Sequence, residues 1–304
     1  MDLLGRALLA ATDLGLVRKV FTGTRPGRAL STRFVAGETL DEAAAVARRL
    51  NAKGARVSLD YLGEHVEDRP QALGARDDYL ACLDRIAADG IDANISIKLT
   101  QLGLGFDDDL AVESLHTLAA RAAEAETSVT VDMEESAFTA ATLDVYEKVQ
   151  AERGNVGIAI QAYLHRTAAD LDRILPLDGH IRLCKGAYAE PEDIAFQSGD
   201  EVDASFDRLL ATLMAAKNVR PAVATHDGDR IRLARNLGSQ RTGYFELQML
   251  YGVRPTLQDQ LLADDLRLRI YVPYGVAWYP YLTRRMAERP ANLWFFLRAV
   301  AGRR

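Results

Sequence analysis

The chain has 304 residues, a length that suits one large domain or two ordinary ones. Apolar residues make up 48% of it and charged residues 26%, the balance of a globular protein with ample material for a core. A formal net charge of −6 argues against a general nucleic-acid binder, and two cysteines are too few for a disulfide framework or a Cys-rich metal site. We therefore expect a reducing, cytoplasmic environment.

Residues 1–50 precede the first predicted strand and have helical periodicity. Asp2 stands before the first apolar run and Arg6 interrupts it, so the run does not resemble a signal peptide. No stretch reaches the roughly 18 uncharged apolar residues expected of a transmembrane helix. We expect a helical extension packed on the rest of the protein, and peripheral contact with the inner face of a membrane is compatible with this pattern.

Eight short β-rich segments follow, separated by Ala-, Leu- and Glu-rich segments with helical periodicity. The predicted strands are 56–62, 94–100, 128–134, 156–164, 180–188, 221–227, 243–250 and 268–275. Eight such units, with strands apolar enough to be covered on both faces, favour a closed (β/α)₈ barrel of the TIM type. An open doubly wound sheet is the alternative, but no GxGxxG motif follows the first strand. We expect a single domain over 1–304, with the barrel and a final helix in 56–304.

Polar residues gather at the carboxyl ends of the predicted strands, where the active sites of such barrels lie. They are Asp60, Glu64, Lys98, Asp132, Glu134, Gln161, Arg182, Lys185, Thr225, His226, Asp227, Glu246, Gln248, Tyr271 and Tyr274. Any one of them could be a solvated loop residue. Their recurrence at the same end of successive strands predicts an enzyme or another small-molecule site.

Lys98 and Asp132 stand at comparable depth on consecutive strands. Burying either charge alone is costly, so we expect an ion pair, which is either structural or stabilises negative charge on a ligand. Lys98 and Lys185 are also the candidates for a Schiff-base lysine of a barrel aldolase. A nearby Asp132 would oppose that role for Lys98, because it favours the charged amine.

Three further features carry candidate chemistry. The run RLCKGAY at 182–188 places a cation beside Gly186, whose flexibility lets the backbone approach a flat ligand. Arg284 and Arg285 point about 100° apart on a helix, so a solvated basic patch is the simplest interpretation of the pair alone. His226 has no second histidine at ligand spacing, so we expect no metal site.

The ordered motifs SLDYLGE, SIKLTQ, VDME, IQAYL, RLCKGAY, ATHD, FELQMLYG and YVPYG…YLTRR resemble the proline dehydrogenase family, in its short monofunctional bacterial form. They run from about residue 35 to about residue 295. The resemblance implies a distorted (β/α)₈ barrel that holds FAD non-covalently, with its last helix over the barrel mouth. It also implies oxidation of L-proline to Δ1-pyrroline-5-carboxylate by hydride transfer to the flavin, with the electrons passed to a membrane quinone. That reaction begins proline catabolism to glutamate, and a separate pyrroline-5-carboxylate dehydrogenase would act next.

The resemblance implies roles for individual residues as well. Arg284 and Arg285 would bind the substrate carboxylate, and Glu64 would pair with one of them. Tyr271 and Tyr281 would flank the proline ring, with Lys98 on the substrate side. Arg182 would lie near flavin N5, and Asp132 would both contact the flavin and hold Lys98. The other implied flavin contacts are Met133, Gln161, Lys185, Gly186, Ala187, Tyr188, Thr225, His226 and Glu288.

Three positions depart from the family pattern: Cys184 replaces a usual Val, Asp227 replaces Asn, and Ala189 stands where larger members carry Trp. Three other functions are weighed against this one: a flavin barrel like methylenetetrahydrofolate reductase, a Schiff-base aldolase, and a binding barrel without catalysis. The paired arginines favour a small amino acid over a pterin.

Overall fold

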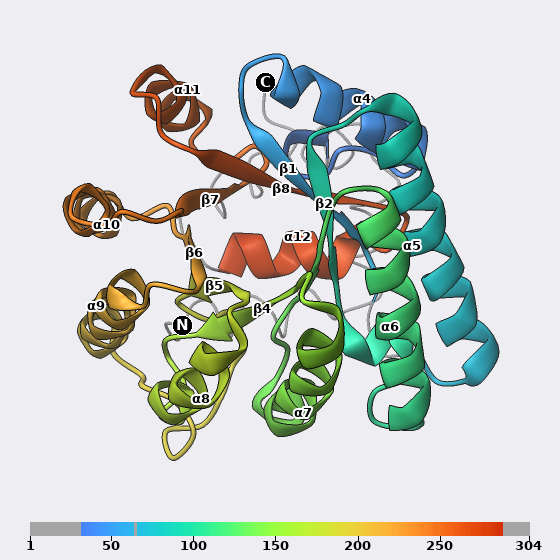
Figure 1. Cartoon of the computed structure of the whole chain (residues 1–304), viewed down its shortest axis with the longest axis horizontal. Helices are drawn as coiled ribbons and strands as arrows, with labels where there is room; N and C mark the ends of the chain where they lie inside the picture. The colour runs from blue at the N-terminus through green and yellow to red at the C-terminus, as the bar shows by residue number, and fades with distance from the viewer. Residues whose placement is uncertain (1–31, 64–65, 288–304) are drawn as a thin grey trace, which may run out of the picture.

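The computed structural model of the protein describes residues 32–63 and 66–287. Eight parallel strands form a closed barrel in chain order, and β1 pairs with β8 to close it (Figure 1). The strands are β1 (Arg56–Tyr61), β2 (Ala93–Ile97), β3 (Val129–Val131), β4 (Val156–Gln161), β5 (His180–Cys184), β6 (Arg220–Ala224), β7 (Glu246–Leu250) and β8 (Leu268–Tyr274). The predicted barrel and its eight strands are therefore confirmed.

Helices surround the barrel on the outside (Figure 1). They are α5 (Arg69–Asp89), α6 (Asp108–Glu124), α7 (Ser136–Arg153), α8 (Thr167–Ile174), α9 (Gly199–Ala215), α10 (Gly228–Ser239) and α11 (Pro255–Ala263), with short 3₁₀ turns at η1 (Leu99–Leu102) and η2 (Leu175–Leu177). Their ends follow local sequence signals. For example, the Asp68 side chain accepts a hydrogen bond from the Gln71 N–H at the start of α5, and Gly90 ends that helix with a φ of +62°.

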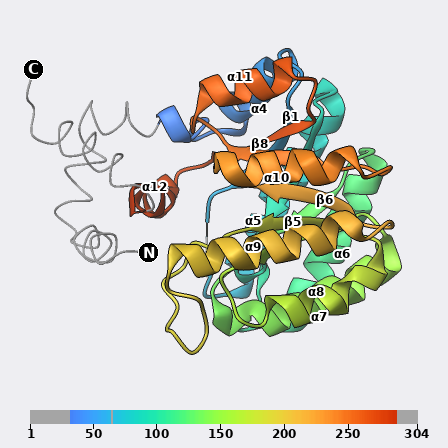
Figure 2. The ribbon, with the colours of Figure 1, turned by 90° about the vertical axis from the view of Figure 1, so that its left-hand side faces the viewer.

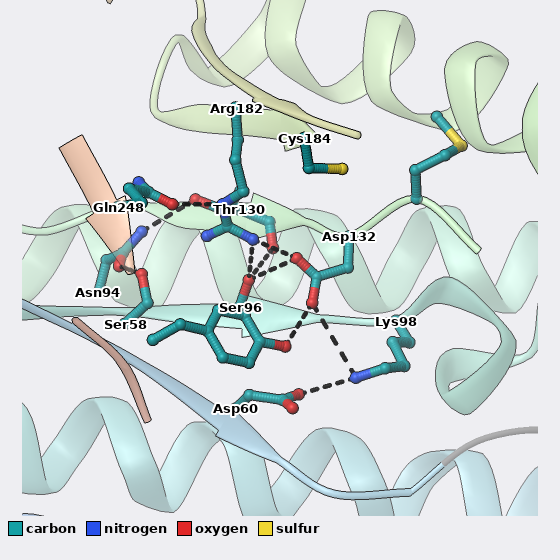
Figure 3. A network of polar contacts seen from close by, with 12 residues as sticks. Ser58, Asp60, Asn94, Ser96, Lys98, Thr130, Asp132, Arg182, Cys184 and Gln248 are labelled. Carbon is teal, nitrogen blue, oxygen red and sulfur yellow. Dashed lines mark hydrogen bonds and ion pairs between the residues drawn. The ribbon is translucent and has the colours of Figure 1, made fainter. Parts of the chain in front are cut away.

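The two faces of the sheet differ in chemistry. Outward residues such as Leu59, Ile95 and Val131 pack against the helices and form the main hydrophobic core. The alternate residues point into the barrel, and Ser58, Asn94, Ser96, Asp132, Arg182 and Gln248 among them are polar and lie close together (Figure 3). The strands are covered on both faces, as expected, but many side chains on the covered inner face are polar.

Small residues in β4 and β6 make room for this polar interior. Gly157 pairs in register with His180, and a Cβ at Gly157 would lie 2.7 Å from the His180 carbonyl oxygen and 2.9 Å from Nδ1. Ala159 and Ala222 flank Arg182 in the same register. Glycine and alanine at these inward positions therefore accommodate the larger side chains of β5.

Helix α4 (Leu40–Asn51) lies outside the barrel, against β1 and β8. It begins with a capping box, in which the Thr39 hydroxyl accepts from the Glu42 N–H and the Glu42 carboxylate accepts from the Thr39 N–H. The expected N-terminal extension is thus helical over this part; the residues before 32 lie outside the described range.

Helix α12 (Trp278–Ala287) crosses one end of the barrel, as Figures 1 and 2 show from two directions. This is the end where the strands finish, because α12 follows β8 directly and packs on Leu62, just after β1. The predicted helix over the mouth is confirmed. Within the described residues, no helix combines the length and the apolar character needed to cross a membrane.

Candidate active site at the barrel mouth

Lys98 lies at the mouth between two carboxylates (Figure 3). Its Nζ is 2.9 Å from Asp60 Oδ1 and 4.0 Å from Asp132 Oδ2. Lys98 is 6% exposed and Asp60 is fully buried, so this is a desolvated cluster. The expected proximity of Lys98 and Asp132 is present, but the nearer partner is Asp60, from β1.

Arg182 lies deeper than Lys98 and joins strands β2, β3 and β7. Its Nη1 forms an ion pair with Asp132 Oδ1 and donates to Ser96 Oγ at 2.9 Å. Its Nε donates to Gln248 Oε1 at 2.6 Å. Its Nη2 is buried and has no hydrogen-bond acceptor among the described residues. The guanidinium is therefore fixed along two edges, and the two N–H groups of Nη2 are left over.

Tyr271 completes the described network from β8. Its hydroxyl donates to Asp132 Oδ2 at 2.6 Å, and the Arg182 guanidinium lies 5.3 Å from its ring centroid. Burial, with the nearby charges of Asp132 and Asp60, raises the pKa of the Tyr271 phenol well above its usual range. Tyr271 is thus a neutral donor, which gives Asp132 hydrogen bonds on both of its oxygens.

Burial also controls the ionisation of Asp60. It raises the pKa of this carboxyl, while Lys98 acts in the opposite direction through charge and hydrogen bonding, and Asp132 adds to the rise. Asp60 Oδ2 has no hydrogen-bond partner among the described side chains. Lys98 is therefore the main contact that opposes the rise in the Asp60 pKa, and the Tyr271 hydroxyl acts in the same direction.

Gln161 and Met133 are adjacent on the β3–β4 side of the mouth. The Gln161 Nε2 donates to the Met133 carbonyl at 3.1 Å, while its Oε1 is buried without a donor among the described residues. Gln161 therefore keeps one acceptor that a ligand could use. The two residues expected near one ligand lie together.

Lys185 belongs to a separate charged cluster beyond the end of β5. Its Nζ lies 2.8 Å from Asp227 Oδ2 and forms a second ion pair with Asp203 in α9. Burial would raise the pKa of Asp227, but hydrogen bonds from Lys185 and the Asp229 N–H, with the charges of Lys185 and Arg230, lower it to about 2. Asp227 is therefore a paired carboxylate that connects β6 to the Lys185 loop. The loop residues that follow, Gly186, Ala187 and Tyr188, are half-buried.

Thr225 and His226 connect the ends of β6 and β7. The Thr225 N–H donates to the Gln248 carbonyl at 3.2 Å, and His226 Nε2 accepts from the Leu250 N–H at 3.0 Å. These bonds hold the ends of β6 and β7 together.

Tyr281 lies in α12, within a small apolar cluster that also contains Phe34, Leu62 and Trp278. The predicted residues Glu64 and Glu288 lie outside the described residues, as do the side chains of Arg284 and Arg285, whose backbone forms part of α12.

Sequence reasoning missed several members of the network. Asp60 and Gln248 were noted only as polar strand-end residues, and Ser96 only as the first residue of the motif SIKLTQ. Ser96 Oγ donates to Asp132 Oδ1 at 2.7 Å and accepts from Arg182. The signal was the alternation in NISIK, where Asn94, Ser96 and Lys98 share one face of β2.

Comparisons with known proteins identify the family of the chain. A family profile described as proline dehydrogenase matches residues 43–298. Proline dehydrogenase 1 of Bacillus subtilis subsp. natto is 37% identical over 281 residues, covering 91% of this chain and 92% of its own. The proline dehydrogenase of Deinococcus radiodurans is 36% identical and covers 89% of this chain and 90% of its own.

A solved structure shares the fold. Proline utilization A from Bdellovibrio bacteriovorus, inactivated by N-propargylglycine, superposes with a TM-score of 0.80 at 23% identity, over 86% of this chain but only 33% of that longer one. The relatives of similar length match almost end to end, whereas the longer protein matches in part. This chain therefore belongs to the proline dehydrogenase family of oxidoreductases, in its short monofunctional form.

Proposed function

We propose that this protein oxidises L-proline to Δ1-pyrroline-5-carboxylate with a non-covalently bound FAD and passes the electrons to a membrane quinone. This would be the first step of proline catabolism to glutamate, with a separate pyrroline-5-carboxylate dehydrogenase acting next. The observation that carries the proposal is a barrel mouth with a balanced set of buried charges, crossed by a helix that contributes two adjacent arginines.

The charges of the mouth explain why those arginines matter. Lys98 and Arg182 face Asp60 and Asp132, so two cations meet two carboxylates and the described network is neutral. A substrate carboxylate entering this site needs additional positive charge. Arg284 and Arg285, on α12, supply two cations, and charge-assisted hydrogen bonds contribute about 1.5–3 kcal/mol each.

The polar groups of the mouth fit a flavin. Arg182 Nη2 is a buried donor and Gln161 Oε1 a buried acceptor, each without a partner among the described residues. An isoalloxazine ring carries both acceptors and donors on its edges, so it could satisfy both atoms. The residues that would hold it are Asp132, Met133, Gln161, Arg182, Lys185, Gly186, Ala187, Tyr188, Thr225, His226 and Glu288. Bound FAD would supply the hydride acceptor.

The chain itself would position the substrate and exclude water. Tyr271 and Tyr281 would form apolar walls around the proline ring, and α12 would cover it. Lys98, fixed by Asp60 and Asp132, would contribute positive charge on the substrate side. The proline nitrogen must be neutral when the hydride leaves, because a protonated amine cannot stabilise the cationic imine that forms.

The geometry is unfavourable for a Schiff-base aldolase. Such chemistry needs a neutral lysine amine, whereas the Lys98 Nζ forms a buried ion pair with Asp60, and Lys185 forms ion pairs with Asp203 and Asp227.

The test is anaerobic addition of L-proline to FAD-loaded protein, followed by visible absorbance. Bleaching of the flavin band is expected, and it should be lost at the same proline concentration in Arg284→Met and in Arg285→Met. Arg232→Met, which removes an exposed arginine of α10, should bleach like the parent. A bound flavin that proline does not bleach would reject the substrate, and protein that takes up no FAD would reject the cofactor.

A further inference from the structure

A line of buried polar contacts runs beneath Arg182, from β8 through β7 to β5. Arg269 Nε lies 2.7 Å from Glu246 Oε1. Gln248 Nε2 donates to the same Glu246 oxygen at 2.7 Å, and Gln248 Oε1 accepts from Arg182 Nε at 2.6 Å. Glu246 is completely buried and Gln248 is 3% exposed, so water does not compete for these bonds.

The carboxylate of Glu246 decides which way the Gln248 amide points. Burial alone would raise the pKa of Glu246, but the charge of Arg269, together with His180 and further hydrogen bonds, holds it well below its usual range. An ionised carboxylate only accepts hydrogen bonds. The NH₂ end of Gln248 must therefore face Glu246, and its oxygen must face Arg182.

The Gln248 oxygen accepts from Arg182 Nε, and no other described hydrogen bond reaches this edge of the guanidinium. Asp132 and Ser96 hold Nη1, and the Tyr271 ring lies 5.3 Å from the guanidinium, but neither contact involves Nε. The bond from Nε to Gln248 anchors a second edge of the guanidinium, which is planar with its donors fixed relative to one another. The direction of Nη2, the donor without a described partner, is then determined as well.

We propose that Gln248, oriented by Glu246, is a positioning residue that sets the orientation of the Arg182 guanidinium and so the positive charge offered to the flavin. The inference rests on the proposed flavin-dependent function. Positive charge held beside a flavin ring favours its reduced form, which carries more negative charge. The predicted consequence is therefore a change in the reduction potential, besides any change in activity.

The test compares Gln248→Met with Gln150→Met. Methionine keeps the approximate volume of glutamine and removes both hydrogen-bonding ends. Gln150 is a matched control, since it is also 3% exposed and bonded at both ends, to the Leu177 carbonyl and the Val156 N–H, on the outer side of the barrel. The midpoint potential of bound FAD is measured with a chemical reductant, so the readout does not require proline turnover.

Gln248→Met should weaken the preference for reduced flavin about tenfold, which for a two-electron couple lowers the potential by about 30 mV. Gln150→Met should leave the potential at the parent value. In an Arg182→Met background, Gln248→Met should add no further shift, because its effect passes through Arg182. Should Gln248→Met not fold, Gln248→Asn serves instead, because its side chain is one methylene too short to span both partners.

The outcomes separate the two proposals. A parent protein that binds FAD and is bleached by proline, but whose potential is the same in Gln248→Met, overturns the positioning role alone. An equal shift with and without Arg182 also overturns it. A parent that binds FAD but is not bleached by proline overturns the proposed substrate while the potential shift is still measured. A parent that binds no FAD overturns both.

Discussion

Two features of the structure favour glycine at position 186: a positive φ and close packing against Tyr163. The sequence suggested that it lets the backbone approach a flat ligand. In the structure its φ is +117°, and a Cβ would lie 2.1 Å from Cδ1 of the Tyr163 ring. The turn after β5 is thus packed on Tyr163 independently of any ligand.

Replacing Gly186 by alanine should therefore both destabilise the fold and displace the loop 185–188. We expect Gly186→Ala to lower the free energy of unfolding by at least about 1–2 kcal/mol, the cost of a left-handed conformation for a residue with a Cβ, and to weaken FAD binding. Urea denaturation and FAD titration measure the two effects. Gly199→Ala is the control, since nothing lies within 4 Å of its Cβ, and as a helical position it should be neutral or slightly stabilised. Equal losses in both variants would contradict this account.

His180 makes stability depend on pH. It is buried at the start of β5, and burial lowers the pKa of its imidazole, with the charges of Arg269 and Arg182 acting in the same direction and Glu246 in the opposite one. In the unfolded chain the imidazole of His180 takes up a proton at about pH 6.5. Below that pH the unfolded state binds more protons than the folded state, so stability must fall as the pH falls.

We expect the free energy of unfolding to decrease between about pH 7 and about pH 5.5, and His180→Leu to flatten this slope. Denaturant titrations at several pH values measure it. If His180→Leu kept the parent slope, the assignment to the buried imidazole would be wrong.

At the scale of elements, the strands and their order could be predicted because nearly all of them contain β-branched residues, β7 being the exception, and each alternates with a helical segment. The partner of Lys98 could not. Asp60 on β1 and Asp132, directly after β3, both lie beside β2, and their depth depends on the stagger of the closed barrel, which a single sequence does not specify. The cover over the mouth was predicted from the family resemblance alone.

Helix α12 is held by a cluster of its own. Phe34, Leu62, Trp278 and Leu282 pack together apart from the main core, and Trp278 Nε1 donates to Glu38 Oε1 at 3.1 Å. We therefore expect that α12 can detach from the barrel mouth while the barrel itself stays folded. Local openings of this kind have free energies below that of global unfolding.

Leu282→Ala should reveal this independence. Leu282 is completely buried, and removing its side chain should weaken the docking of α12 by about 2–5 kcal/mol. We expect KM for L-proline to rise at least tenfold, with little change in the thermal transition of the barrel. Val276→Ala, at a position that is 71% exposed, should leave KM unchanged. A large fall in melting temperature at unchanged KM would show instead that α12 is part of the barrel's cooperative unit.

At the scale of the whole molecule, the barrel interior is an unusual place for charge. Interiors of such barrels are commonly filled by branched apolar side chains, whereas here Glu246 is completely buried and forms an ion pair with Arg269, whose side chain is 11% exposed. Arg269 also donates to the Val57 carbonyl at 2.8 Å and to Asn94 Oδ1 at 3.1 Å, and the Tyr244 hydroxyl donates to Glu246. These bonds connect strands from both ends of the sequence, so the network helps to close the barrel.

A double-mutant cycle on this pair tests whether the two charges depend on one another. Glu246→Gln and Arg269→Met should each lower the free energy of unfolding by about 3–5 kcal/mol, because each leaves its partner buried and unpaired. The double variant should lose clearly less free energy of unfolding than the two single variants added together, because it leaves neither charge without its partner. The exposed pair Arg235–Asp264, at 2.7 Å, is the control, and its coupling should stay below about 1 kcal/mol. A coupling energy for Glu246–Arg269 no larger than that of Arg235–Asp264 would mean that water enters the barrel interior. Each polar residue there would then be solvated independently of the others.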